Sequence, residues 1–393
     1  MHPPSVVPSY GDGAPRMIAQ FIDHRDARWK EFLQRTPHDF YDLPEYAEVV
    51  AAEAGAMPVA FYAKHGSATC LIPLLIRTIP AGLNAPQDWY DCVSPYGYPG
   101  IVLSPSQEAL SSFLDAFCHI ARKYGIVTAF LRLHPLFPLA QGPLEKYGQL
   151  IQHGPTVSIN LAESKEHIWE QVSTNHQRDI KKLIRLGFHS ALDDWSRFQE
   201  FIVLYYANMK RVGAKEEYFF SPDYFENLRA KLGSQIHLVC VLTATNELAA
   251  AGLMIVTKGI AQHHLGATAA QYQRRSPSKL VVDVMWRWAQ EQSCHTFHFG
   301  GGVGASEDSL FQFKAGFSPM RNQFYSYRIV VDDAKHAALN QAAKELRCVP
   351  TSSDFFPEYR HLQEQHDPGL ILRCSNDRIA RHAEHILTPI WTL

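Results

Sequence analysis

The sequence predicts an α+β fold built from two tandem copies of one unit, each a mixed, mostly antiparallel sheet flanked by helices. Two helical segments 178 residues apart share their pattern, and each is followed by two apolar runs separated by a polar turn. A second helix and another strand then follow in both copies. The length of 393 residues also exceeds that of a usual single domain.

The repeated helices are DLPEYAEVVAAEAG, which ends at Gly55, and FSPDYFENLRAKLG, which ends at Gly233. Both have proline at the first helical position and glycine just past the end, and Ser221 is a good N-cap for the second. Five identities coincide at the constant offset: Pro44 and Pro222, Tyr46 and Tyr224, Glu48 and Glu226, Ala52 and Ala230, Gly55 and Gly233. A duplication explains this agreement better than a chance alignment of two α+β segments.

The other elements follow in the same order in both copies. VAFYA and CLIPLLI form a hairpin in the first copy, as HLVCV and LAAAGLMIV do in the second. The helix SQEALSSFLDAFCHIARKYG then corresponds to SKLVVDVMWRWAQEQ, and the strand VTAFLRL to HTFHFGG. Between the copies, ESKEHIWEQVSTNHQRDIKKLIRLG indicates two helices that form a hinge.

These elements predict four parts of the chain. Residues 1–19 form a flexible leader, 20–160 the N-terminal domain, 161–332 the C-terminal domain with the active site, and 333–393 a helical extension. The extension has one helix over DAKHAALNQAAKELR and another near RIARHAEHIL.

Composition excludes several classes of protein. A net charge near −2 gives no global attraction to nucleic acid or anionic lipid, so such contacts would need a local basic patch. The seven cysteines show no C-x-x-C spacing, which argues against a disulfide framework or zinc site and favours the reducing cytoplasm. The longest apolar run, LAAAGLMIV, is about half of what a membrane span needs. We therefore expect a cytoplasmic protein without a membrane span.

The stretch HFGGGVGASEDSLFQFKAGF, from His298 to Phe317, resembles a dinucleotide fingerprint only superficially. The acidic residue expected about 20 positions further on is missing, and no Gly-Lys-Ser/Thr closes a phosphate loop. What remains is a strand, a glycine turn that permits close backbone approach, and a short helix from near Ser306 with Glu307 and Asp308 in its first turn.

Several segments together resemble the FemAB-like branch of the GNAT acyltransferase superfamily. They are SPYGYPG, NHQRDIKKLIRLG, RRSPSKLVVDVMWRWAQEQ, HFGGG and LFQFKAGF, in this order, and the resemblance spans about residues 40 to 330. Proteins of this branch fuse two GNAT-like folds, and Fem members transfer an aminoacyl group from tRNA to an amine of a peptidoglycan precursor of the cell envelope. The resemblance therefore implies two tandem GNAT-like domains and an aminoacyltransferase or N-acyltransferase.

Two departures from the family pattern bear on the donor. The loop that holds the pyrophosphate of acetyl-CoA is rich in glycine in many GNAT enzymes, but here it reads QRRSPSK. Arg274, Arg275 and Lys279 at this helix start would still suit a donor phosphate. No long charged heptad segment matches the coiled-coil arm of some Fem proteins. Aminoacyl-tRNA is thus the favoured donor, with acyl-CoA as the alternative.

The resemblance makes Lys314 the principal catalytic candidate, because the FKxxF-like segment is similar to the Fem motif whose lysine lies at the reaction centre. A partly desolvated ammonium there would face the oxyanion of acyl transfer. Spacing alone instead favours a lysine that snorkels from a short apolar helix. Glu307 and Asp308 are candidate bases, although acidic residues in a first turn more often complement the helix dipole.

Substrate-binding candidates come from three segments. The SPYGYPG region supplies aromatic and hydroxyl groups, the basic helix supplies cations for phosphates, and the glycine turn supplies backbone. The candidates are Asp91, Tyr96, Tyr98, Arg178, Lys182, Arg185, Gly300, Gly301, Gly302 and Phe313. Lys181 recurs with the basic residues at helical spacing, whereas a charged face is ordinarily only solvated. No metal site is expected, since His295 and His298 project to opposite faces of a strand.

The sequence therefore predicts transfer of an aminoacyl or acyl group to an amine of a larger acceptor that carries a nucleotide or phosphate. Aminoacyl-tRNA or acyl-CoA would be the co-substrate, with no tightly bound cofactor, and tRNA is a possible partner. The alternative is a non-catalytic protein that binds or scaffolds envelope or polysaccharide precursors. The residues leave the acceptor, the pathway and the oligomeric state open.

Overall fold

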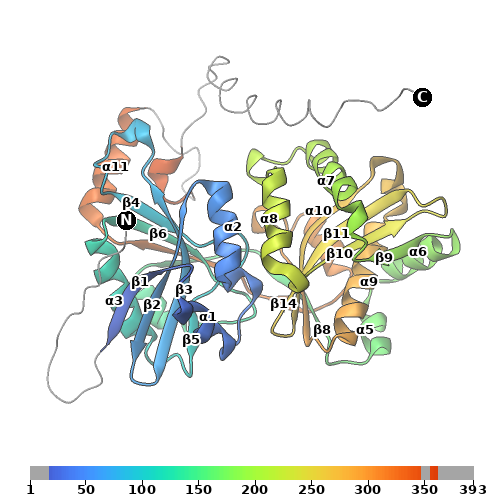
Figure 1. Cartoon of the computed structure of the whole chain (residues 1–393), viewed down its shortest axis with the longest axis horizontal. Coiled ribbons are helices and arrows are strands. Elements are labelled where there is room, and N and C mark those ends of the chain that lie inside the picture. Colours follow the sequence, from blue (N-terminus) through green and yellow to red (C-terminus); the bar gives the residue numbers. More distant parts are fainter. Residues whose placement is uncertain (1–16, 347–354, 362–393) are drawn as a thin grey trace. The chain divides into compact units, whose positions relative to one another are not determined.

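The computed structural model describes residues 17–346 and 355–361. Of these residues, those up to His336 form one compact unit, and those from Ala337 belong to a second. The first unit contains two mixed sheets flanked by helices, which confirms the predicted fold class (Figure 1). None of the helices within the described ranges is long and apolar enough to cross a membrane.

The strands of the two sheets follow equivalent orders. The first sheet runs in the order β1 (Ile18–Asp23), β2 (Met57–His65), β3 (Ala68–Thr78), β4 (Tyr90–Val93), β6 (Ile126–Arg132), β15 (Tyr325–Val330), β7 (Gln149–Gln152), with β5 (Val102–Ser104) beside β3. The second runs β9 (His189–Leu192), β10 (Ile236–Leu242), β11 (Leu248–Thr257), β12 (Ile260–Thr268), β13 (Thr296–Gly300), β8 (Thr156–Asn160), β14 (Arg321–Asn322). The parallel pairs β4–β6 and β12–β13 hold equivalent places, and the other pairs are antiparallel.

The two sheets exchange one strand each. By its place after β7, strand β8 would complete the first sheet, but it pairs with β13 and β14 of the second. Strand β15 follows β14, yet it pairs with β6 and β7 of the first sheet. The sheets therefore do not divide the chain at residue 160, and the domain boundaries drawn from the repeat stay a prediction. Strand β1 begins at Ile18, inside the expected leader.

The helices include those expected from the sequence and others for which no range was predicted. They are α1 (Ala27–Gln34), α2 (Pro44–Ala54), α3 (Leu110–Lys123), α4 (Gln141–Glu145), α5 (Lys165–Gln171), α6 (Thr174–Arg185), α7 (Phe198–Val212), α8 (Pro222–Leu232), α9 (Ser278–Glu291), α10 (Ser309–Ala315) and α11 (Asp333–Glu345). The segment expected to be a hinge forms helices α5 and α6. Helix α6 packs against α9, which covers the second sheet, so α6 is part of that layer. The helix expected near RIARHAEHIL lies outside the described residues.

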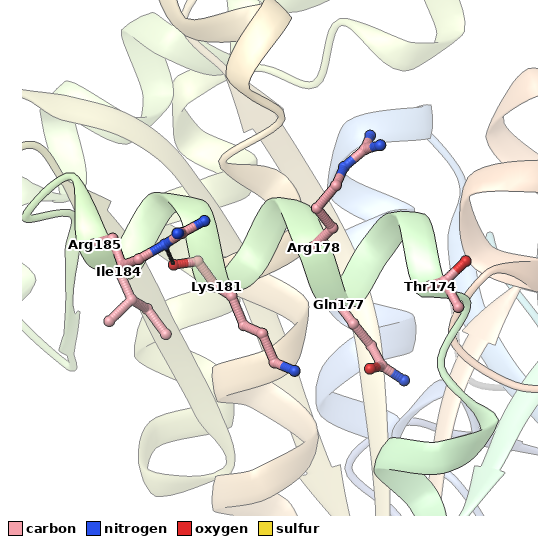
Figure 2. Close-up of a pocket in the computed structure, with 6 residues that line it drawn as sticks. All are labelled: Thr174, Gln177, Arg178, Lys181, Ile184 and Arg185. Carbon is pink, nitrogen blue, oxygen red and sulfur yellow. Dashed lines mark hydrogen bonds between the residues drawn. The ribbon is translucent and has the colours of Figure 1, made fainter.

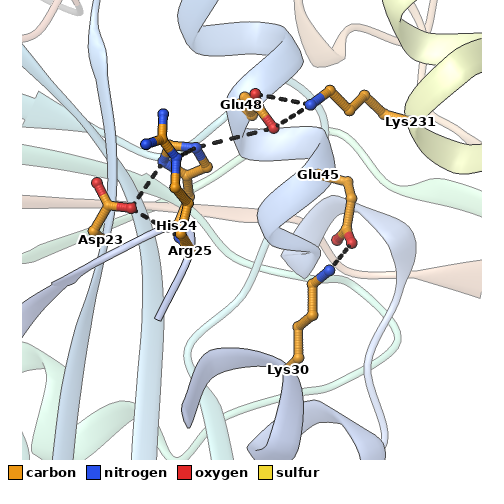
Figure 3. A network of polar contacts seen from close by, with 7 residues as sticks. All are labelled: Asp23, His24, Arg25, Lys30, Glu45, Glu48 and Lys231. Atoms are coloured by element: carbon orange, nitrogen blue, oxygen red, sulfur yellow. Dashed lines mark hydrogen bonds and ion pairs between the residues drawn. The ribbon is translucent and has the colours of Figure 1, made fainter. Parts of the chain in front are cut away.

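The two repeated helices, α2 and α8, begin and end at the predicted offset and pack against each other (Figure 1). Ser221 caps α8. Its N–H and its hydroxyl also donate hydrogen bonds to the carboxylate of Glu53, at the end of α2, at 2.9 and 2.5 Å. Lys231 of α8 forms an ion pair with Glu48 of α2 at 2.8 Å (Figure 3). The duplicated helices thus join the two halves with polar contacts.

An apolar core continues across the same contact. Tyr46 of α2, Phe225 of α8 and Leu253 of β11 are fully buried in one cluster that includes residues of both halves. Burial of such side chains contributes about 1.5–3 kcal/mol each, so this shared core outweighs the exposed ion pair. The halves are therefore held together chiefly by apolar packing.

We expect Ser221→Ala to lower the free energy of unfolding by about 1–2 kcal/mol, because it removes the cap of α8 and a donor to Glu53. Chemical denaturation measures the change. Ser112→Ala, on the exposed side of α3, is the control and should change stability little. Equal effects at the two serines would contradict a role for this cap.

Candidate functional site

The site begins where the parallel strands β12 and β13 part. They pair only from Ile260 to Gln262 with Thr296 to His298, and β12 then continues to Thr268 alongside β11 alone. A register shift in the β11–β12 pairing at this point leaves His264 without a cross-strand partner. The strands therefore diverge at the carboxyl end of β13, immediately before the glycine turn.

Lys314 lies on α10 beside this divergence. Its side chain is buried, with 8% of the residue exposed, and Nζ donates a 2.5 Å hydrogen bond to the carbonyl oxygen of Gly301. Burial lowers the pKa of Lys314 from 10.5 to about 8, although Asp308 opposes the change. Lys314 is thus a desolvated lysine beside the glycine turn.

The three consecutive glycines each meet a close neighbour. Gly300 has a positive φ of 74°, and a Cβ there would lie 2.9 Å from the hydroxyl of Tyr98. The N–H of Gly301 donates to that hydroxyl at 2.9 Å. A Cβ on Gly302 would lie 2.1 Å from the carbonyl oxygen of Ser306. Both backbone groups of Gly301 are therefore hydrogen-bonded. Its N–H donates to Tyr98 of the first half, and its carbonyl oxygen accepts from Lys314 of the second.

Three histidines lie on β12 and β13, and burial lowers the pKa of each. His298 is fully buried between Gln262 and Thr156, at 2.7 and 2.8 Å from its two ring nitrogens. The pKa of His264 falls to about 3, and its Nε2 hydrogen-bonds the hydroxyl of Tyr224 at 2.9 Å. The pKa of His263 also falls to about 3, partly because Lys314 is close. His263 is thus a neutral imidazole beside the lysine, a role that its place in an apolar strand did not indicate.

The two acidic candidates differ from expectation because α10 begins three residues later than predicted. Asp308 is the N-cap, and its carboxylate accepts from the N–H of Phe311 at 2.9 Å and of Val303 at 3.2 Å. Glu307 lies outside the helix and is exposed. Asp308 therefore fixes the helix start, and the structure brings neither carboxylate into contact with Lys314.

The SPYGYPG region contributes unequally. Tyr98 reaches the glycine turn, and the ring of Tyr96 packs against Phe220 at 5.5 Å. Asp91 is fully buried in an ion pair with Arg77 at 2.8 Å, which places it in the sheet and not at the turn. The carbonyl of Phe313 accepts from Nε2 of His176 at 2.9 Å, so this contact joins α10 to α6.

The start of α9 is only partly available to an anion. Lys279 is buried and its Nζ forms an ion pair with Asp179 at 2.6 Å. Ser276 stands at a positive φ of 53°, where the family loop would place glycine. Arg274 and Arg275 are exposed. Two of the three predicted phosphate-binding cations are therefore free of that internal ion pair.

The basic face of α6 borders a surface hollow of about 610 Å³. Its lining residues are Thr174, Gln177, Arg178, Lys181, Ile184 and Arg185 (Figure 2). Lys182 is exposed but does not line it. Figure 2 shows that Arg178 and Lys181 extend in different directions from the helix. The hollow is separate from Lys314, although α6 contacts α10 through His176.

A family model described as an acetyltransferase (GNAT) domain matches residues 171–314, which include both the basic helix and Lys314. Residues 171–314 are a GNAT domain. No curated protein sequence matches the chain. The predicted GNAT relationship and the class of acyltransferase are therefore confirmed, and an acyl donor is the co-substrate of this class.

Solved structures share the fold over most of the chain. FemX matches with a TM-score of 0.63 at 13% identity, over 81% of this chain and 99% of its own. L-PGS from Bacillus licheniformis matches with 0.51 at 12% identity, over 81% and 96%. The C-terminal domain of a protein described as a lysylphosphatidylglycerol synthetase, from Agrobacterium fabrum, matches with 0.50 at 15% identity, over 81% and 95%. These likenesses support the tandem GNAT arrangement.

The lowered pKa of Lys314 predicts a pH-dependent stability. Between about pH 8 and 10.5 the unfolded chain keeps a proton on Lys314 that the folded GNAT domain has lost, so rising pH stabilises the fold. The gain is up to ~3 kcal/mol. The Lys314→Met variant lacks this gain, so its free energy of unfolding relative to that of wild type should fall as pH rises over this interval. Urea unfolding measures the difference. Lys123→Met, at an exposed position, is the control; parallel curves for wild type and Lys314→Met would contradict the burial of the charge.

Proposed function

We propose that the protein transfers an aminoacyl or acyl group to an amine of a larger, phosphate-bearing acceptor. Aminoacyl-tRNA is the favoured donor and acyl-CoA the alternative. The observation that carries the proposal is Lys314, a buried lysine held on the Gly301 carbonyl where β12 and β13 part. Such a buried cation destabilises the empty site. Negative charge that develops on a substrate oxygen during the reaction would compensate for its lost solvation.

In the proposed reaction the deprotonated amine attacks the carbonyl carbon of the donor. The carbonyl oxygen becomes an oxyanion, and the donor oxygen or sulfur then leaves as the C=O bond re-forms, while the proton that the attacking nitrogen loses passes to the leaving atom. The ammonium of Lys314 stabilises the oxyanion, and Gly301 keeps Nζ in place until the charge develops. His263 remains neutral near pH 7 and adds no second positive charge beside the lysine.

The local electrostatics favour tRNA as the donor. At the start of α9, Lys279 forms an ion pair with Asp179. Its charge is therefore less available to a pyrophosphate that binds there. The α6 face instead offers Arg178, Lys181 and Arg185 around an open hollow. Exposed cations on one helix suit the phosphates of a nucleic acid backbone. In FemX and the lysylphosphatidylglycerol synthetase the same fold occurs under names that imply aminoacyl transfer, which supports this choice.

We expect the protonated form of Lys314 to be the active one, so kcat/KM should fall as pH rises through about 8. Lys314→Arg keeps the positive charge and should lack this decline, even if its activity is lower. Lys314→Ala should lose about 10²–10³-fold in kcat. Steady-state kinetics from pH 6.5 to 9.5 measures all three proteins.

Lys123→Ala, at an exposed position, serves as the control and should keep the wild-type profile. A descending limb that persists in Lys314→Arg would assign the ionisation to another group. Unchanged biological activity of Lys314→Ala would instead support a non-catalytic scaffold.

The α6 face predicts salt-sensitive binding of tRNA. Replacing Arg178, Lys181 and Arg185 together with glutamine should weaken binding and reduce the slope of log K against log salt by about 2–3. Charged tRNA, uncharged tRNA and a panel of acyl-CoAs are titrated at two salt concentrations. A variant with glutamine at the exposed Arg25, Arg35 and Lys123 has the same net charge and should bind as wild type. Tighter binding of acyl-CoA than of tRNA would refute the tRNA donor.

A further inference from the structure

The first sheet has an open end equivalent to the Lys314 site. Its parallel pair, β4 and β6, occupies the place that β12 and β13 hold in the second sheet. Arg132 is the last residue of β6, and Tyr96 follows the end of β4. Ser94 joins the two ends, because its N–H bonds to Phe130 and its hydroxyl accepts from the N–H of Arg132 at 3.0 Å. Ligands of sheets with parallel strands bind outside such carboxyl ends.

The guanidinium of Arg132 has no hydrogen bond or ion pair within the described part of the chain. The guanidinium packs against the ring of Phe130, 5.2 Å from the centroid. Burial lowers the pKa of Arg132, and Arg77 adds to this effect. Arg77 itself is paired with Asp91. Glu217 acts on this charge, but no carboxylate forms an ion pair with Arg132 among the described residues, so the guanidinium is available to an anion from outside the chain.

Two phenol groups converge on Arg132. Tyr96 and Tyr218 lie 6.4 Å apart between ring centroids, and both interact electrostatically with the guanidinium. Among the described residues neither hydroxyl has a hydrogen-bond partner, and none of the three groups is sealed from solvent. Three partly exposed polar groups, from β6, the turn after β4 and the segment before α8, thus act on one another.

We propose that Arg132, with Tyr96 and Tyr218, binds a carboxylate of the acceptor, which would make the acceptor an amino acid or peptide with a free carboxyl group. A guanidinium matches a planar carboxylate in two parallel hydrogen bonds, and the phenols can donate to its remaining lone pairs. One monoanion neutralises one guanidinium. A phosphate dianion would bring excess negative charge near Glu217, which also acts on Arg132.

The proposed carboxylate site lies next to the reaction centre. Tyr98 interacts electrostatically with Arg132 and accepts the N–H of Gly301, whose carbonyl receives Lys314. One acceptor molecule could therefore place its carboxylate at Arg132 and its amine toward Lys314. This inference rests on the proposed function for the direction of transfer, but binding of the carboxylate is independent of turnover.

The test compares triglycine with triglycinamide, which share an amine and differ in the terminal carboxylate. Ligand-observed NMR titration of the full chain should show at least a tenfold preference for triglycine. Arg132→Gln should abolish this preference, whereas Arg132→Lys should still bind triglycine a few-fold more tightly than triglycinamide. Tyr218→Phe should reduce it a few-fold. Arg35→Gln, an exposed arginine of the same charge, should leave it unchanged.

The outcomes separate the hypotheses. Equal binding of the two peptides by wild type, or no binding of either, overturns the carboxylate site, and tighter binding of inorganic phosphate than of triglycine overturns the choice of ligand. Arg132→Gln should melt at the same or a higher temperature, since an unpaired charge is removed; a large fall would assign a structural role instead. A preference that persists in Lys314→Ala while no donor supports transfer would keep this site and refute the proposed function.

Discussion

The exchange of β8 and β15 between the sheets is the constraint on which the rest of the structure depends. Each sheet is completed by a strand from the other half of the chain, so neither can form its full ladder alone. The exchange also brings the chain around β8 and β15 close to the glycine turn. Phe324, directly before β15, packs against Tyr98 at 5.1 Å, and Tyr98 holds the N–H of Gly301. The catalytic candidate in the second half is thereby positioned from the first.

Two buried charges of the fold are neutralised by ion pairs, whereas the cations of Lys314 and Arg132 have no ion pair among the described residues. Buried Lys279 and Asp91 each have an ion-pair partner within 3 Å. Among the described residues, Nζ of Lys314 bonds to a carbonyl oxygen, and the guanidinium of Arg132 packs against an aromatic ring. Both have a lowered pKa because burial penalises the cation. Functional sites commonly retain such destabilising groups, since substrate charge later compensates for them.

The sequence predicted local features well and long-range pairing poorly. Proline and glycine fixed the ends of α2 and α8 because they act through the local backbone. The strand exchange left no signal, since a buried apolar strand has the same pattern in either sheet. Asp308 was placed inside a helix that it instead caps, an error of register at a polar helix start. Asp179 could not be paired with Lys279 from sequence, because 100 residues separate them.

The candidate site shows the same division. Lys314 was found through family resemblance, whereas its spacing alone favoured a surface lysine. Its burial depends on the glycine turn and α10 meeting in space. Arg132 was missed because a single arginine at the end of an apolar strand resembles an ordinary edge residue. Only the register of β6 with its neighbours places it beside the two tyrosines.

The two copies have diverged at equivalent strand ends, and this divergence argues for one reaction centre with two binding regions. After β13 the chain continues with glycines that admit close approach. After β6 it continues with Leu133, His134 and Pro135. Both ring nitrogens of His134 are bonded, to Asp39 at 3.1 Å and to the N–H of Leu136 at 3.1 Å, so this side chain is held by contacts within the first copy. Arg132 beside it can still hold an anion, and the first copy therefore suits recognition of substrate while the second suits the chemistry.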